Sequence, residues 1–174
     1  MADPRPWLKN YPKGLPANID VDQYPNLNSF LNEAMTKFAE KPAFYCMGKS
    51  ITYGEMDKAS KQMGGYLQSR GLKPGDRVAI MMPNLLQYPI ALFACIRAGF
   101  IVVNVNPLYT PRELLYQLKD SGVKGIIIVE NFASHLQEIL GQTQIETIIL
   151  TSIGELLGPI KGSIVNFVVR KIKR

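Results

Sequence analysis

The stretch Arg77-Val-Ala-Ile-Met-Met-Pro-Asn-Leu-Leu-Gln-Tyr-Pro-Ile-Ala-Leu-Phe-Ala-Cys-Ile-Arg-Ala-Gly-Phe-Ile-Val-Val-Asn104 decides the fold class of this chain. It contains an apolar strand-like run at residues 77–82, a helical segment at residues 84–98 and a second apolar run at residues 100–104. Strands that are apolar at every position are typical of a parallel sheet that is covered on both faces. We therefore predict an α/β fold with an open, doubly wound sheet.

The same alternation of helices and strands continues beyond this stretch. The predicted strands are residues 77–82, 100–104, 125–129 and 147–150. The predicted helices are residues 54–70, 84–98, 111–120 and 133–140. Because helix and strand alternate from residue 54 onward, we expect a mainly parallel sheet with helices on both faces.

The part of the chain before residue 54 has a different pattern. Its predicted elements are an irregular arm over residues 1–25 with five prolines, a helix from about residue 28 to residue 39, and a hairpin of residues 43–47 and 51–53. Asn28 or Ser29 can cap that helix. Gly48-Lys49 is the expected turn of the hairpin.

Composition and charge exclude several classes of protein. The chain has 174 residues, of which 47% are hydrophobic, so it can form one compact domain and is not disordered. Two cysteines and one histidine exclude a disulfide scaffold and a four-ligand Cys/His metal site. The net charge is +6, but residues 160–174 hold five basic residues and no acidic one, which leaves 15 basic and 14 acidic residues elsewhere. A nearly neutral body argues against a nucleic-acid partner.

The basic C-terminal segment, residues 160–174, is also amphipathic. On a helical wheel one broad apolar side is interrupted by Lys161 and Lys171. The apolar residues are Ile160, Ile164, Val165, Phe167, Val168, Val169 and Ile172, and the polar ones opposite are Asn166, Arg170, Lys173 and Arg174. This pattern fits a helix that rests on an anionic membrane surface. It fits equally a helix packed against a neighbouring domain.

The sequence also bears on localisation. The first 25 residues lack the apolar core of a secretory signal. The longest apolar stretch, residues 90–103, contains Arg97 and Gly99 and falls short of a membrane-spanning helix. We expect a cytoplasmic protein that can lie peripherally on the inner face of the membrane.

One segment imitates a phosphate-binding loop. Ala43-Phe-Tyr-Cys-Met-Gly-Lys-Ser50 fits a permissive P-loop pattern. A P-loop, however, needs a flexible glycine-rich loop between a strand and a helix. Here the loop positions are bulky and strand-favouring, and Ile51-Thr-Tyr53 follows instead of a helix. A hairpin is therefore the favoured interpretation, and no GxGxxG motif supports a dinucleotide site either.

Two glycines lie inside a predicted helix. Gly64 and Gly65 should each cost about 1 kcal/mol relative to alanine in that position. Ser60 and Gly64 are four residues apart and form a smooth stripe. We interpret this stripe as a close contact between the helix and the sheet, without a ligand role.

The remaining chemically capable side chains have structural explanations. His135 is the only histidine and has neither a nucleophile nor an orienting acid at a motif position. Glu55, Asp57 and Glu113 fall in the first turns of predicted helices, where carboxylates favour the positive end of the helix dipole. We assign none of these residues to catalysis.

Residues 51–130 resemble the start of an adenylate-forming enzyme. The resemblance rests on Ile51-Thr-Tyr-Gly-Glu-Met56, Gly71-Leu-Lys-Pro-Gly-Asp-Arg-Val-Ala-Ile80, Met82-Pro-Asn-Leu-Leu-Gln-Tyr-Pro-Ile-Ala91 and Arg97-Ala-Gly-Phe-Ile-Val-Val-Asn-Val-Asn-Pro-Leu-Tyr-Thr-Pro-Arg-Glu-Leu114. Within that superfamily, the sequences of these segments are most similar to those of the bacterial long-chain fatty acid–CoA ligases. Trp7-Leu8, Tyr11-Pro12 and Val165-Asn-Phe-Val-Val-Arg-Lys-Ile-Lys-Arg174 extend it over nearly the whole chain.

The resemblance implies a two-step reaction for the parent enzyme. A fatty acid attacks the α-phosphate of ATP to give acyl-AMP and pyrophosphate, and CoA then displaces AMP, with Mg²⁺ neutralising phosphate charge. The family's machinery is a Ser/Thr/Gly-rich phosphate loop, an adenine- and ribose-binding set, and a lysine on a C-terminal domain. None of these motifs occurs in residues 1–174. We therefore assign no catalytic, cofactor-binding or metal-binding residue in this chain and expect none of these cofactors to bind it alone.

The resemblance also implies a domain organisation. Residues 1–25 would be an N-terminal arm, residues 26–151 the N-terminal α/β portion of the AMP-binding large domain, and residues 152–174 a basic amphipathic tail. We expect a scaffold segment of a longer ligase, inactive alone and prone to self-association. The alternative is a stand-alone, non-catalytic α/β interaction module with a lipid-binding tail.

Overall fold

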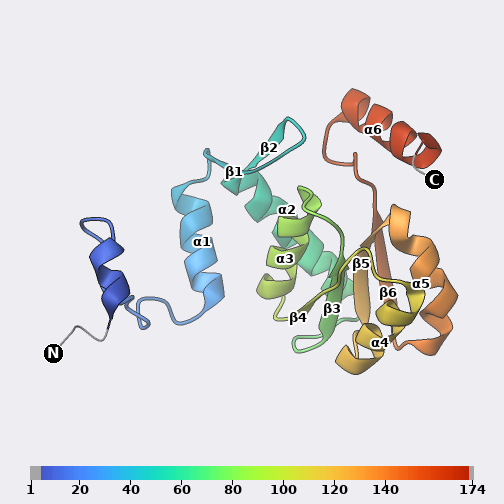
Figure 1. The fold of residues 1–174 in the computed structure, drawn as a ribbon, viewed down its shortest axis with the longest axis horizontal. Coiled ribbons are helices and arrows are strands. Elements are labelled where there is room, and N and C mark those ends of the chain that lie inside the picture. The colour runs from blue at the N-terminus through green and yellow to red at the C-terminus, as the bar shows by residue number, and fades with distance from the viewer. Residues whose placement is uncertain (1–4, 173–174) are drawn as a thin grey trace.

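The computed structural model describes residues 5–172 and contains a parallel sheet with a separate hairpin (Figure 1). The helices are η1 (Pro6–Asn10), α1 (Leu27–Lys37), α2 (Tyr53–Ser69), α3 (Gln87–Arg97), α4 (Pro111–Ser121), η2 (Glu130–Phe132), α5 (Ala133–Ile139), η3 (Leu140–Gln142) and α6 (Pro159–Ile172). The strands are β1 (Pro42–Cys46), β2 (Lys49–Thr52), β3 (Arg77–Met81), β4 (Ile101–Asn104), β5 (Gly125–Val129) and β6 (Thr147–Thr151). The prediction of an α/β fold is confirmed.

The main sheet is parallel throughout, with strand order β4-β3-β5-β6. Val78 of β3 pairs with Val102 on one side and with Gly125 on the other. After β3 the chain forms β4 on one side of β3. It then crosses back over β3 and forms β5 on the other side. This reversal places a topological switch point between β3 and β5, and ligands of open α/β sheets bind outside the carboxyl ends of the strands at such a point.

Helices cover both faces of the sheet, as the apolar strands require. Val78, Ile80 and Ile127 pack against α2 and α3 on one face. On the other face, Ala79 and Ile126 belong to a second core that α4 and α5 complete. Every residue of β5 is buried. This double coverage is the reason why the strands read as continuous apolar runs.

Local capping explains where two of the helices begin. Glu55 N–H donates to Thr52 Oγ1 at 3.1 Å, and Thr52 N–H donates to Glu55 Oε2 at 2.8 Å. Thr110 and Glu113 form the same reciprocal box ahead of α4. These hydrogen bonds satisfy amide groups that the first turn leaves free. Glu55 and Glu113 thus have structural roles, as expected, although the capping box is a more specific explanation than the helix dipole.

Four local expectations differ from the structure. The α1 cap is Asn26, which accepts a hydrogen bond from Ser29 N–H at 2.9 Å, and neither Asn28 nor Ser29 is the cap. The hairpin turn is Met47-Gly48 and not Gly48-Lys49, because Cys46 pairs with Lys49. The helix predicted from residue 84 begins at Gln87. The arm predicted to be irregular contains η1.

Candidate functional site

The carboxyl edge of the sheet carries polar residues from several loops. Asn84 follows β3, Glu130 follows β5, Thr151 ends β6 and Ser152 follows it. Parallel strands bring their carboxyl ends to one edge, so these residues come from the region in which α/β proteins bind ligands. The arrangement of α6 against this edge determines which of these groups remain available.

An ion pair fixes α6 to the end of β5. Arg170 Nε donates to Glu130 Oε1 at 2.9 Å, and Arg170 Nη2 donates to Glu130 Oε2 at 2.9 Å. The hydrogen bond from Arg170 to this carboxylate, together with the opposite charge, raises the pKa of the guanidinium. Bidentate pairing sets orientation as well as distance. Glu130 is therefore not a free carboxylate at this edge.

A second set of contacts places the polar side of α6 against the loop after β6. Gly154 N–H donates to Asn166 Oδ1 at 2.8 Å, and Asn166 Nδ2 donates to Ser152 Oγ at 2.9 Å. The backbones approach closely at Gly154 and Gly162, since a Cβ built on Gly154 would lie 2.3 Å from the Gly162 carbonyl oxygen. Only glycine fits this crossing.

The apolar side of α6 faces away from the domain. Ile160 is 77% exposed and Phe167 is 62% exposed, and Ile164 and Val168 are exposed beside them. We call these four residues the α6 stripe. Val165 and Val169, which the helical wheel groups with them, are half-buried. Lys173 and Arg174, which belong to the predicted basic tail, lie outside the described residues.

A polar hollow of about 410 Å³ lies between the ends of β5 and β6 and α6. It is lined by Glu130, Leu150, Thr151, Ser152, Glu155 and Asn166. Its polar groups bond mainly to one another: Thr151 Oγ1 donates to Glu155 Oε2, and Ser152 N–H contacts the same oxygen. Within residues 5–172, no group of three His, Cys, Asp or Glu side chains is placed to hold a metal ion.

The segment that imitates a P-loop is a hairpin in the structure. β1 and β2 pair antiparallel, and Met47 and Gly48 form the turn with φ of 50° and 76°. A helix does follow, but only after β2. The interpretation of residues 43–50 as a hairpin is confirmed.

The other residues that the sequence singled out are structural. Gly64 is buried, and a Cβ there would lie 3.1 Å from the carbonyl oxygen of Ala94 on α3. The close contact is confirmed, but it is made with a helix and not with the sheet. Ser60 is fully buried and donates to Asp57 O at 3.1 Å. His135 Nδ1 lies 3.0 Å from Tyr109 O, which holds the loop before α4.

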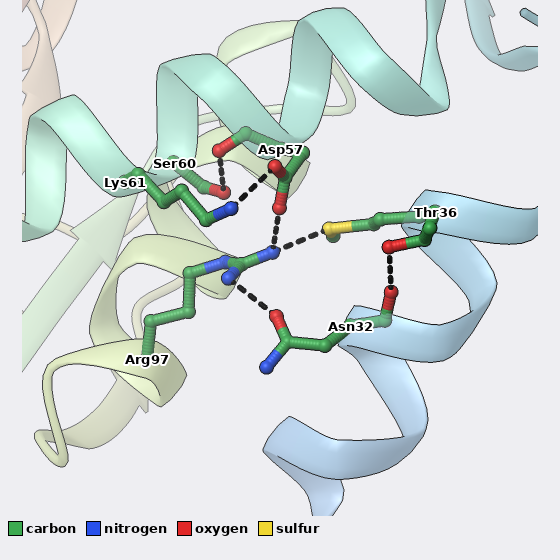
Figure 2. A network of polar contacts seen from close by, with 7 residues as sticks. Asn32, Thr36, Asp57, Ser60, Lys61 and Arg97 are labelled. Carbon is green, nitrogen blue, oxygen red and sulfur yellow. Dashed lines mark hydrogen bonds and ion pairs between the residues drawn. The ribbon is translucent and has the colours of Figure 1, made fainter. Parts of the chain in front are cut away.

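The polar network around Arg97 was not predicted from the sequence (Figure 2). Arg97 of α3 contacts Asp57 of α2, donates to Asn32 Oδ1 of α1 at 2.7 Å and lies against Met35 Sδ. Lys61 joins the same carboxylate at 2.6 Å. Asp57 is therefore an ion-pair partner in addition to a first-turn acid. The sequence signal for this network was Arg97, the one charged residue in an otherwise apolar helix. An arginine in such a place is rarely buried without a partner, so it predicts an ion pair.

The model of the family described as AMP-binding enzyme matches residues 31–164. The chain belongs to the AMP-binding enzyme family. It is 53% identical over 169 residues to a long-chain-fatty-acid–CoA ligase of Salmonella typhimurium and 50% identical to one of Escherichia coli O6:H1. These matches cover 97% of this chain and 30% of each relative, so the chain spans about a third of the relatives' length.

Solved structures of other CoA ligases show the same fold. An anthranilate CoA ligase matches with a TM-score of 0.70 and 23% identity over 74% of this chain and 25% of that one. A long-chain-fatty-acid-CoA ligase from Archaeoglobus fulgidus matches with a TM-score of 0.64 and 23% identity over 79% of this chain and 28% of that one.

The described helices of this chain include none that is long and apolar enough to cross a membrane.

Proposed function

We propose that this chain is the N-terminal α/β portion of a long-chain fatty acid–CoA ligase. The whole protein would convert fatty acid, ATP and CoA to acyl-CoA, AMP and pyrophosphate through an acyl-adenylate, with Mg²⁺ on the phosphates. The observation that carries this proposal is the 53% identity to a ligase of that name over 97% of the chain. Residues 26–151 would form the sheet of the large domain, residues 1–25 an arm and residues 152–174 a tail.

Within that enzyme, these residues would act as a scaffold without chemistry of their own. Acyl-adenylate formation needs preorganised donors around the triphosphate, because charge develops on the departing pyrophosphate. Residues 1–174 contain no Ser/Thr/Gly-rich loop that ends in lysine. The acidic groups at the sheet edge are engaged, Glu130 with Arg170 and Glu155 with Thr151. We therefore propose that the 174-residue chain binds no ATP and forms no acyl-CoA.

A pyrophosphate-release assay with fatty acid, ATP and Mg²⁺ tests the inactivity of the purified chain. A complete bacterial long-chain fatty acid–CoA ligase serves as the positive control. Calorimetry with ATP·Mg²⁺ gives a second readout. The expected result is no release above background and no heat of binding. Stoichiometric micromolar binding of ATP, or release that depends on fatty acid, would contradict the scaffold proposal and place a nucleotide site within these residues.

A second proposal concerns an anionic membrane surface. The α6 stripe is exposed while the polar side of α6 is docked on the domain, and this orientation supports a peripheral contact at the inner face of the membrane of a cytoplasmic enzyme. Co-sedimentation with anionic vesicles, compared with a chain that ends at Pro159, tests it. Equal binding of both chains would favour the alternative that α6 packs against another domain.

Self-association is the remaining expectation for the isolated chain. Ile148 and Leu150 of the edge strand β6 are exposed, which supports pairing of this edge with other chains. Sedimentation velocity over a range of concentrations tests it, and a monomer at all concentrations would contradict it.

A further inference from the structure

We propose that the tip of the β1–β2 hairpin, residues 45–48, forms one lipid-facing surface together with α6. Its occupant would be an anionic phospholipid bilayer, with a lipid phosphate at Lys161. This inference rests on the proposed membrane contact of α6 and adds a second element to it. The hairpin tip and α6 lie at the same end of the molecule (Figure 1).

Lys161 joins the two elements although they are far apart in the sequence. Its ammonium group donates to the carbonyl oxygen of Met47. A Cβ built on Gly48 would lie 3.0 Å from Lys161 Nζ and 3.8 Å from the hydroxyl oxygen of Tyr45. The ammonium, the phenol and the turn are therefore immediate neighbours, and the first turn of α6 is fixed beside the hairpin tip.

The hairpin tip exposes two large side chains. Tyr45 is 76% exposed and Met47 is 45% exposed. Met47 has a φ of 50°, a conformation that favours asparagine or glycine in a two-residue hairpin turn. The turn therefore holds a large apolar side chain that is nearly half exposed. An apolar side chain at the tip is suited to the boundary between headgroups and acyl chains.

The charges around the stripe match an anionic surface. A lysine ammonium has three donor hydrogens, and Met47 O accepts one from Lys161. The neighbouring Tyr45 hydroxyl can donate to the same phosphate oxygen. Lys171 is exposed at the other end of the stripe, whereas Arg170 is engaged with Glu130. The polar side of α6 faces the domain, so its apolar side, with a lysine at each end, is the side that would face the lipid.

Vesicle binding of the 174-residue chain tests the composite surface. The probes are vesicles of phosphatidylglycerol mixed with phosphatidylcholine and vesicles of phosphatidylcholine alone. Met47→Asp tests the hairpin, Phe167→Asp tests the α6 stripe, and Tyr66→Asp, at an exposed aromatic toward the other end of α2, is the matched control. We expect about fivefold weaker binding to the anionic vesicles for each of the first two variants and no change for the control.

The outcomes separate the hairpin inference from the membrane proposal. If Phe167→Asp weakens binding but Met47→Asp does not, the hairpin inference is overturned and the α6 contact stands. If the unmodified chain does not bind anionic vesicles, both are overturned. Equal binding to both kinds of vesicle would overturn the anionic bilayer as the occupant, because phosphatidylcholine carries the same phosphate without a net negative charge. A dimer that Met47→Asp dissociates, without vesicle binding, would assign the surface to a second copy of the chain.

A fluorescence measurement covers the case in which Met47→Asp fails to fold. Tyr45→Trp in a Trp7→Phe background places the single tryptophan at the hairpin tip, at a strand position that accepts aromatic residues. Its emission should shift to shorter wavelength when anionic vesicles are added. An unshifted emission from chain that has sedimented with the vesicles would show that the tip stays in water, and would overturn the inference.

Discussion

The guanidinium of Arg97 on α3 forms an ion pair with the carboxylate of Asp57 on α2, at the point where both helices meet α1 (Figure 2). The Arg97 side chain is only 11% exposed. Its second terminal nitrogen, Nη1, donates to Asn32 Oδ1 on α1. One side chain therefore links three helices through polar contacts, beside the hydrogen bond from Asn28 Nδ2 of α1 to Ile96 O of α3.

Replacing Arg97 should weaken this junction. We expect Arg97→Met to lower the free energy of unfolding by about 2–3 kcal/mol, because it removes the guanidinium donor to Asn32 and the least exposed partner of Asp57, which then keeps only Lys61. Lys61→Met should cost less than about 0.5 kcal/mol, because that pair is exposed and lies within one helix. Urea denaturation monitored by circular dichroism measures both. Equal effects of the two variants would show that the Arg97 pair is screened like a surface pair.

The two adjacent glycines of α2 should respond in opposite directions to the same substitution. Gly64→Leu should destabilise the fold by about 1–3 kcal/mol, because the side chain would press on Ala94 of α3 and on Ala98 just after it. Gly65 is exposed and a Cβ there meets nothing within 4 Å, so Gly65→Leu should stabilise by up to about 1 kcal/mol through helix propensity. Thermal and urea unfolding of the pair provide the test. Stabilisation by Gly64→Leu would mean that α2 and α3 do not approach at this glycine.

The parallel sheet could be predicted because its signals are local. Residues 125–129 are apolar at every position, and the structure buries all five. The helix starts were less certain, because several polar residues near one helix start compete for the cap. Asn26, Asn28 and Ser29 are all residue types that cap helices. In the structure Asn26 is the cap, and Asn28 Nδ2 donates instead to Ile96 O of α3.

The contacts around α6 could not be predicted, because they join residues far apart in the chain. Sequence periodicity finds the apolar side of α6 but cannot tell whether that side packs on its own domain. The orientation depends on Arg170 meeting Glu130 and on Lys161 meeting Met47. Neither pair has a fixed spacing that a motif could record. The absence of catalytic groups in this chain stays a prediction.

The two cysteines should differ in reactivity. Burial raises the pKa of the Cys95 thiol to about 12, so that roughly one molecule in ten thousand would hold the thiolate at pH 8. Cys46 is only half-buried at the hairpin. Titration of the native chain with a disulfide reagent should show one fast thiol, which Cys46→Ser removes, and two thiols in denaturant. A fast thiol that persists in Cys46→Ser would show that α3 opens readily around Cys95.

Acid sensitivity should arise in part from Asp76. Its side chain accepts a hydrogen bond from Lys124 Nζ at 2.7 Å and one from Lys73 N–H at 2.8 Å, and these hold the pKa of the carboxyl below its ordinary value of 3.8. The folded pKa is lower than the unfolded one. The stabilisation is therefore present above about pH 4 and is lost as the pH falls through 3.8 toward the folded pKa.

The corresponding measurement is the unfolding midpoint as a function of pH, for the unmodified chain and for Asp76→Asn. The variant should be less stable at neutral pH, and its midpoint should fall less steeply below about pH 4, because the group that takes up the proton on unfolding is gone. Asp120→Asn, which removes an exposed carboxylate on α4, is the control and should leave the slope as it is. Parallel curves for the unmodified chain and Asp76→Asn would show that the bond to Lys124 does not persist in solution. In that case the turn before β3 would depend on its backbone hydrogen bonds alone, such as the one from Gly75 N–H to Gly99 O at 2.8 Å.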